Sequence, residues 1–153
     1  MVIDAPLDSG YSDYADRDRV PDQGDFIVET HRPRRFRVAY HAHASVEVNY
    51  LDGCEMEYSF SGRSVRVPER RMTAFWGAVP HSVTQVIGDG RIINLYVSFP
   101  RVLQWALPTG FVESLVAGEV LSAAGESGVD DELFARWLAD SSNPDPAWRR
   151  LIL

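Results

Sequence analysis

The sequence is short of cysteine, of basic residues and of long apolar runs, and each shortage excludes a class of protein. Cys54 has no second cysteine to pair with, which excludes an internal disulfide and favours a reducing compartment. No apolar run approaches the roughly 18 residues of a membrane-spanning helix, and the N-terminus is acidic, unlike a signal peptide. We therefore expect a soluble, cytoplasmic protein with no membrane partner.

The charge balance argues against nucleic acid as a direct partner. Asp and Glu number 22 against 15 Lys and Arg, which gives a net charge of −7. Nonspecific affinity for DNA comes from basic side chains that displace phosphate counterions. This chain by itself is therefore not expected to bind DNA well.

The first 25 residues have a composition of their own. They hold seven Asp and two Arg among Gly, Ser and Pro, with few apolar residues to offset the cost of ordering. We expect a disordered acidic arm over residues 1–25. Tyr11 and Tyr14 could dock this arm on the body of the protein.

From Phe26 the pattern changes to short strand-like runs separated by turn signals. The runs cover residues 26–29, 35–40, 57–60, 64–67, 72–76, 82–87 and 91–99, and the turn signals cover 51–53, 61–63, 67–70, 77–80 and 88–91. Strands at this spacing without intervening helices predict a sandwich or barrel over residues 26–99. Arg35 and Arg37 suit a solvated outer or edge face, with anion binding as the alternative.

Residues 100–153 are expected to be helical. Apolar spacing predicts helices over 100–106, 110–120 and 130–140, and a further helix after Ser142 or Asn143 as its cap. We expect these helices to cover the outer face of the barrel, with packing or subunit-interface roles for Trp105, Trp137 and Trp148. The abrupt apolar end suggests a piece of a longer protein.

The stretch from 41 to 53, HAHASVEVNYLDG, contains most of the candidate metal-ligating residues. If it forms one strand, the even spacing of His41, His43 and Glu47 places three ligand types on one face, which Asn49 and Leu51 continue. The opposite face is almost wholly apolar: it consists of Tyr40, Ala42, Ala44, Val46, Val48 and Tyr50. This pattern predicts a barrel wall with a site inside and a hydrophobic cover outside.

His81 is placed to complete the site, because it follows the turn signal at 77–80 and begins a new strand. Three imidazoles and one carboxylate, from His41, His43, His81 and Glu47, suit zinc, nickel, iron or manganese. Hydrogen bonding to a ligand without any metal is the alternative.

These motifs resemble a known family. The HxHxxxE pattern followed by a glycine, and the later Pro-His, look like the two motifs of the cupin superfamily, whose fold is a β-jelly roll. Together with LPTGF, GEVL and the helical tail, they resemble the N-terminal sensing domain of AraC-family regulators of the melibiose-regulator type, over residues 26–153. Arg35 replaces the usual cupin glycine, and the asparagine that often follows the second motif is replaced near Gln85.

The resemblance implies a mainly β protein: a cupin-type jelly-roll barrel followed by a C-terminal bundle of short helices. It further implies a carbohydrate effector, a homodimer, and DNA binding through a C-terminal module that this chain lacks. For the effector, aromatic and amide side chains are the candidates: Trp76 first, then Tyr58 and Tyr96, with Asn49 and Gln85 for hydroxyl groups. Phe75 and Trp76 point to opposite faces, so only one of them is inside.

Two other functions remain open. A centre of three histidines and one glutamate is similar to that of cupin dioxygenases and oxalate-degrading enzymes, although no additional acid or base stands out. A purely structural dimerisation module would require a barrel packed shut by its own side chains. For a regulator, we expect effector binding to order the arm or to shift the helical tail.

Overall fold

The computed structural model describes residues 2–4, 26–32, 39–143, 145 and 147–148. Most of the predicted arm, including Tyr11 and Tyr14, lies outside these residues, as do Arg35, Arg37 and the last five residues. The strands are β1 (Val2–Asp4), β2 (Phe26–His31), β3 (Ser45–Phe60), β4 (Arg63–Val67), β5 (Thr73–Trp76), β6 (His81–Ser98) and β7 (Leu121–Ser122). The helices are α1 (Phe99–Gln104), α2 (Thr109–Val116) and α3 (Gly128–Ser141).

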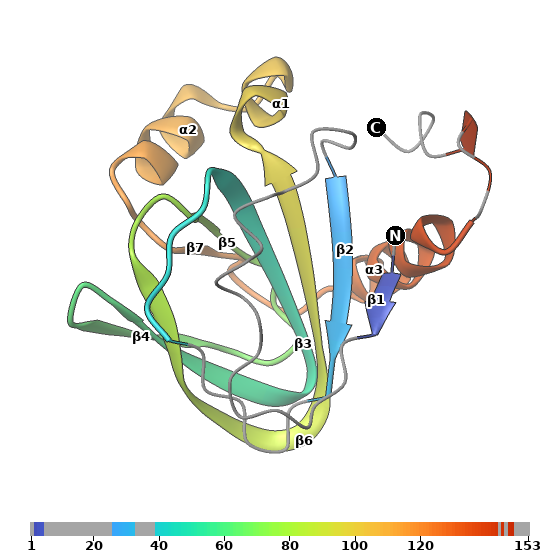
Figure 1. Cartoon of the computed structure of the whole chain (residues 1–153), viewed down its shortest axis with the longest axis horizontal. Helices are drawn as coiled ribbons and strands as arrows, with labels where there is room; N and C mark the ends of the chain where they lie inside the picture. The colour runs from blue at the N-terminus through green and yellow to red at the C-terminus, as the bar shows by residue number, and fades with distance from the viewer. Residues whose placement is uncertain (1, 5–25, 33–38, 144, 146, 149–153) are drawn as a thin grey trace.

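The strands form one strongly curved, mainly antiparallel sheet (Figure 1). Its order is β1-β2-β6-β3-β5-β7, with β4 also paired to β3, and only the β1–β2 pair is parallel. The prediction of a mainly β protein with a few helices is confirmed. The finer jelly-roll assignment stays a prediction.

Two long strands, β3 and β6, pair along almost their whole length and form the frame of the sheet. The predicted turns at 51–53 and 88–91 are wrong, because both segments continue as strand through a register shift after Asp52. Gly53 and Gly88 have φ of 72° and 103° there, conformations that favour glycine. A Cβ on Gly90 would lie 2.0 Å from the Asp52 carbonyl oxygen. These glycines therefore bend the paired strands where the sequence pattern indicates a turn.

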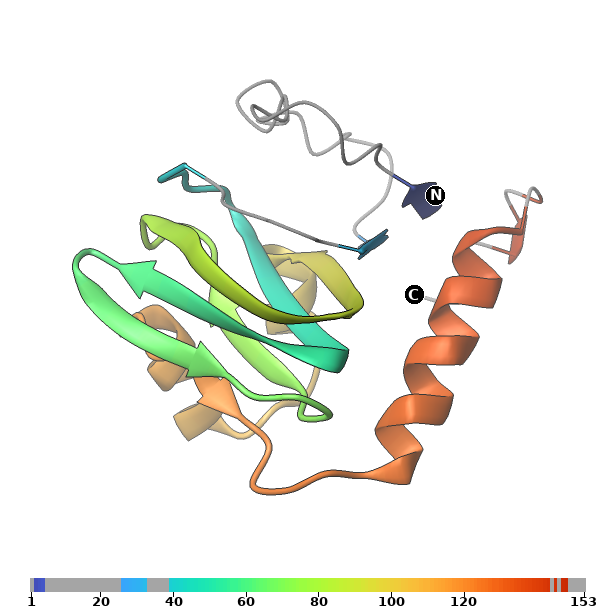
Figure 2. The ribbon, with the colours of Figure 1, turned by 90° about the horizontal axis from the view of Figure 1, so that it is seen from below.

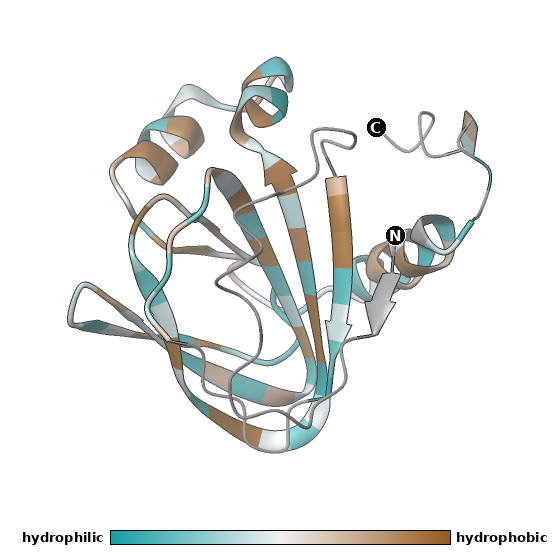
Figure 3. Cartoon of the chain, viewed as in Figure 1, coloured by the Kyte–Doolittle hydropathy of each residue, from teal (hydrophilic) through white to brown (hydrophobic). Residues whose placement is uncertain are grey.

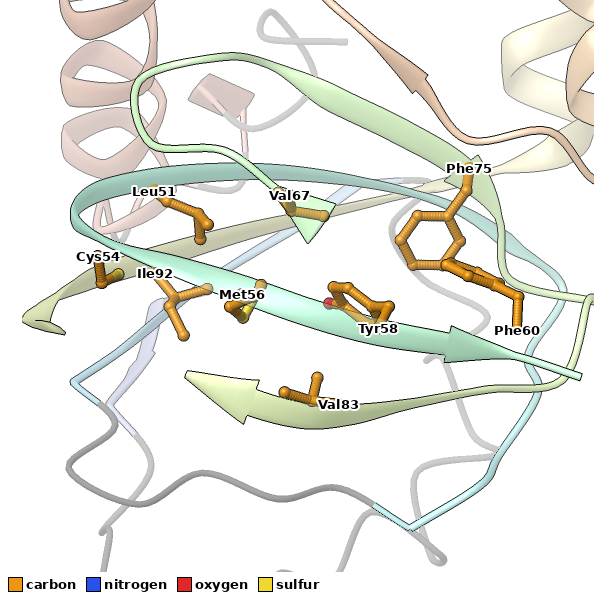
Figure 4. Packing of buried hydrophobic residues seen from close by; sticks show 9 residues of the cluster. All are labelled: Leu51, Cys54, Met56, Tyr58, Phe60, Val67, Phe75, Val83 and Ile92. Atoms are coloured by element: carbon orange, nitrogen blue, oxygen red, sulfur yellow. The ribbon is translucent and has the colours of Figure 1, made fainter. Parts of the chain in front are cut away.

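The apolar side chains of β3 belong to two separate core clusters, and Figure 3 shows polar and apolar residues alternating along the strand. On the inner face, Leu51 packs with residues of the distal half of β3 and its neighbours: Cys54, Met56, Tyr58, Phe60, Val67, Phe75, Val83 and Ile92 (Figure 4). On the outer face, Val46 and Tyr50 pack with side chains from each helix: Val102 of α1, Leu115 of α2 and Phe134 of α3.

The helices lie on two sides of the sheet. Figures 1 and 2 show α3 beside the edge formed by β1 and β2, and α1 and α2 together at another side. The Phe134 ring stacks on Tyr50 with centroids 4.6 Å apart, and Trp137 packs edge-on against Phe26 at 5.8 Å. Each such aromatic pair contributes about 0.5–1.5 kcal/mol beyond area burial. Among the described residues, no helix is long and apolar enough to cross a membrane.

The helix boundaries differ from the predicted ones at capping residues. α2 begins at Thr109, one residue before the predicted start, and Pro108 is its N-cap. α2 ends at Val116, and Gly118 follows with a φ of 78°. Ser142 is the C-cap of α3, so it ends one helix instead of beginning the next.

Candidate functional site

The three candidate histidines come together because two segments run antiparallel beside each other. His41 and His81 exchange two backbone hydrogen bonds of 3.0 Å, and the His43 N–H donates to the Gly77 carbonyl at 2.9 Å. β3 begins only at Ser45, so the predicted single strand from 41 to 53 is wrong. His41 and His43 reach the site through this flanking ladder and not through the alternation of one strand.

The three imidazoles form a compact cluster at the boundary between interior and surface. One ring nitrogen from each of His41, His43 and His81 lies within 4.8 Å of the others. His81 is fully buried, whereas His41 and His43 are partly exposed. The aromatic rings of Phe60 and Phe75 pack on the buried imidazole at centroid distances of 5.7 and 4.9 Å.

Backbone carbonyls fix the tautomers of two of these rings. His41 Nδ1 lies 3.0 Å from the Ala39 oxygen, and His81 Nδ1 lies 2.8 Å from the Val79 oxygen. A carbonyl only accepts, so each Nδ1 carries a hydrogen, and in the neutral form of each ring the lone pair is then on Nε2. This arrangement is the usual orientation of metal-binding histidines. Burial also lowers the pKa of His41, which favours the neutral imidazole that a metal requires.

Glu47 is the buried carboxylate of the cluster. Its Oε2 lies 3.2 Å from His43 Nε2 and 3.6 Å from His81 Nε2, and its Oε1 accepts a 3.0 Å hydrogen bond from the Tyr58 hydroxyl. Burial raises the pKa of Glu47, but the hydrogen bond with His43 and the neighbouring His81 imidazole outweigh burial and hold that pKa well below its usual value. Glu47 is therefore ionised and acts only as an acceptor.

The donor set fits a divalent metal ion. His81 Nε2 and His43 Nδ1 are buried without a hydrogen-bond partner. Two nitrogens that share one zinc ion lie about 3.4 Å apart, given zinc–nitrogen bonds of about 2.1 Å in a tetrahedron. The observed limit of 4.8 Å is about 1.4 Å longer, so the three rings would have to draw together around an ion. Imidazoles with an ionised carboxylate beside them are the ligand types that zinc, nickel, iron and manganese accept.

The predicted effector residues divide between the two faces of the sheet. Tyr58 and the fully buried Asn49 lie on the inner face, and the Tyr96 ring lies 5.4 Å from the His43 ring. Trp76 instead stacks on Phe99 of α1 at 4.9 Å, and its Nε1 donates to the Ala44 carbonyl.

Gln85 is exposed on β6. The structure therefore does not bring Trp76 or Gln85 to the histidines. Phe75, fully buried, is the member of the Phe75–Trp76 pair that faces the interior.

Three buried polar residues on the inner face escaped sequence reasoning. Asn94 of β6 is the cross-strand partner of both Asn49 and Glu29, and His31 follows two residues after Glu29 in β2. Glu29 Oε2 lies 3.4 Å from His31 Nε2, and all of these side chains are at most 5% exposed. Their period-2 spacing was a signal, but only the pairing register shows that they share a face with Glu47.

A second polar cluster fixes α3 to the outer face. The Tyr50 hydroxyl and the Arg70 guanidinium both bond to the carboxylate of Asp131 in the first turn of α3. Arg70 Nε also lies 3.4 Å from Glu126. Arg70 has a φ of 54°, and its N–H donates to the Leu51 carbonyl at 2.8 Å. This strained residue thus joins β3 to α3.

Comparison with known proteins finds relatives in sequence and a similar solved structure. No family model matches the sequence. The melibiose operon regulatory proteins of two Escherichia coli strains are 22% identical to the chain over 113 residues, which are 74% of this chain and 37% of each regulator. The chain thus spans little more than a third of these relatives. An apo ToxT variant from Vibrio cholerae shares the fold over 82% of this chain and 50% of that chain, with a TM-score of 0.55 and 9% identity.

Proposed function

We propose that this chain, which the two comparisons support as an AraC-family regulator domain, binds its small-molecule effector on the inner face of the sheet. One observation carries the proposal: Glu47, Asn49, His81 and Asn94 are all at most 4% exposed on a face where a purely structural sheet would be apolar. Buried polar groups are costly, so their concentration indicates a ligand.

The proposed effector is a carbohydrate, with melibiose as the first probe because of the named relatives. Isothermal titration and thermal unfolding would measure binding to the full chain, with sucrose as a matched disaccharide. A ligand at about 100 times its Kd stabilises the folded state by about 2.7 kcal/mol, which is several degrees in Tm for a chain of this size. No heat of binding and no Tm shift with any sugar tested would contradict the carbohydrate assignment.

We also propose a divalent metal held by His41, His43, His81 and Glu47. When bound, such an ion would supply a Lewis acid that polarises an oxygen atom of the effector. Elemental analysis after incubation with zinc, nickel, iron or manganese should find about one ion per chain, and none in His41→Ala or His81→Ala. Gln85→Ala, at an exposed position on β6, is the control. A metal-free wild type would refute this site and leave a hydrogen-bonding pocket.

The metal proposal also decides the enzyme alternative. If stoichiometric metal is found, oxygen consumption and oxalate turnover by the loaded protein should be measured. We expect neither, because the named relatives are regulators. Turnover abolished by His81→Ala would instead favour the cupin-enzyme function.

The finer architecture is a further part of the proposal. We assign a jelly-roll barrel to residues 26–99, packing helices to 100–153 and an arm to 1–25, of which the strand β1 pairs with β2. A homodimer is proposed because Leu103 and Trp105 after β6, and Val116 in α2, are more than 40% exposed. Light scattering should give twice the 17.2 kDa chain mass, and a monomer at high concentration would refute it. DNA contact is assigned to a part of the regulator outside these residues.

A further inference from the structure

Two asparagines form a polar pair deep on the inner face, beyond the histidine cluster. Asn49 of β3 and Asn94 of β6 are cross-strand partners, with exposures of 0% and 4%. They belong to one row across four strands, which Glu29 of β2 extends on one side and Thr73 of β5 on the other. The backbone pairing of β3 with β6 places the two residues opposite each other without any ligand.

Among the residues that the structure describes, each amide of the pair has one polar atom without a hydrogen-bond partner. Asn49 Oδ1 lies 3.5 Å from the Tyr58 hydroxyl, while Asn49 Nδ2 has no hydrogen-bond partner. Asn94 Nδ2 donates to the Tyr96 hydroxyl at 3.2 Å, while Asn94 Oδ1 has none. The pair therefore presents one open donor and one open acceptor inside the protein. Buried groups of this kind are normally satisfied, so the exception requires an explanation.

The chemistry of the open atoms selects the ligand group. A hydroxyl accepts from an N–H and donates to a carbonyl oxygen, so one hydroxyl matches both open atoms. A carboxylate cannot donate, and the neighbouring Glu29 and Glu47 would repel it. An ammonium cannot accept. We propose that Asn49 and Asn94 form a second subsite that binds a neutral hydroxyl group of the effector.

The register gives the length of that effector. Glu47 lies two residues before Asn49 in β3, and Tyr96 lies two residues after Asn94 in β6. The two form the neighbouring cross-strand pair on the same face. Two residues of strand rise span about 7 Å. An effector that contacts the histidine cluster with one oxygen thus places its second hydroxyl about 7 Å deeper. This span fits a monosaccharide unit or a short sugar alcohol, and the inference rests on the proposed effector function.

The test removes both amides together. Leucine has nearly the shape of asparagine without its polar atoms, so Asn49→Leu/Asn94→Leu removes the subsite while filling its space. We expect melibiose, galactose and galactitol to bind this variant at least 100-fold more weakly than wild type, because a site built for a hydroxyl loses its discrimination with its polar groups. Gln85→Leu, at an exposed position of β6, should bind as wild type.

The stability of the same variant decides the inference even if no sugar binds. Amides kept for a ligand leave the ligand-free protein with unsatisfied groups, so the double variant should have an unchanged or higher Tm. A lower Tm would show that the amides support the fold, and it would overturn the subsite.

Unchanged sugar affinity in the double variant would overturn the subsite while leaving the proposed function intact. A wild type that binds no sugar, together with a stabilised double variant, would refute the carbohydrate assignment alone. High-resolution crystallography of the protein soaked in galactitol adds a direct view. A hydroxyl between the two amides supports the subsite, and an ordered water that galactitol does not displace overturns it.

Discussion

Replacing Gly77 with alanine tests whether the backbone of the turn before β6 positions the histidine cluster. A Cβ at this position would lie 2.1 Å from His43 Cε1, 2.3 Å from Nδ1 and 2.6 Å from Nε2. Ordinary van der Waals contact begins near 3.4 Å, so the imidazole has to move by more than an ångström. Gly77 has no positive φ, so alanine meets no backbone strain, and the three nearest atoms to its Cβ all belong to the His43 ring.

The displaced ring loses its contact with Glu47, which is 3.2 Å away in the wild type. Overpacking of this kind costs about 1–3 kcal/mol. Metal affinity should fall at least about 10-fold, because even indirect disturbance of a ligand has that effect. Denaturant unfolding measures the loss of stability, and zinc titration against a competing chelator measures the loss of metal affinity.

Gly110→Ala is the matched control, because nothing lies within 4 Å of a Cβ there. Gly110 is in the first turn of α2, where alanine should leave stability unchanged or raise it by up to about 1 kcal/mol. A Gly77→Ala protein with wild-type stability and zinc affinity would refute the assignment of Gly77 as the space for His43.

Three more predictions concern the surroundings of the site. Tyr58→Phe removes the 3.0 Å hydrogen bond to Glu47 and should cost about 1.5–3 kcal/mol in denaturant unfolding, whereas Tyr40→Phe at the surface should change little. Burial raises the pKa of the Cys54 thiol to about 11, so iodoacetamide at pH 8 should label it only in the unfolded protein. Folding favours the neutral thiol, so its contribution to the free energy of unfolding is complete below pH 9 and should be lost as pH rises towards 11. A Cys54→Ala protein that lost the same stability at alkaline pH would contradict this prediction. Phe134→Ala opens a cavity beside Tyr50 and should destabilise by about 3–5 kcal/mol, and hydrogen exchange that stayed slow in α3 would count against its anchoring role.

The sequence predicts local alternation well and long-range register poorly. Period 2 correctly separates Glu47 and Leu51 from Val46 and Tyr50, because strand geometry forces neighbouring side chains to opposite faces. It cannot show that Asn94 faces Asn49, because that depends on how β6 pairs with β3 over 44 residues of chain. The sequence therefore identifies Asn49 as a candidate but not its partner Asn94.

Glycine explains two of the wrong predictions. The segment around Gly53 and the segment from Gly88 to Arg91 have the composition of a turn, because turns and strand bends both need positive φ. Which of the two forms depends on whether a partner strand is present on both sides of the bend. Here each segment is the partner of the other, so both remain within strands.

The placement of His41 and His43 follows the same reasoning. The motif correctly pointed to residues that come together, but the alternation of one strand was the wrong physical reason. Their position depends on backbone bonds to His81 and Gly77 in another segment. Trp76 shows the converse: its alternation relative to Phe75 was clear, but only the packing of Phe99 of α1 shows which face is outside.

The two faces of β3 connect the candidate site to α3 through consecutive residues. Asn49 faces the interior, Tyr50 bonds to Asp131 at the start of α3, and the Leu51 carbonyl accepts from the Arg70 N–H. Arg70 closes the connection by bonding to the same carboxylate. A shift of Asn49 on ligand binding therefore displaces groups that hold α3, because one short backbone segment carries all of them. The ligand can change the position of α3 only as far as it binds one arrangement more tightly than another. The free energy of the change therefore comes from the ligand, and the segment from Asn49 to Leu51 transmits the displacement.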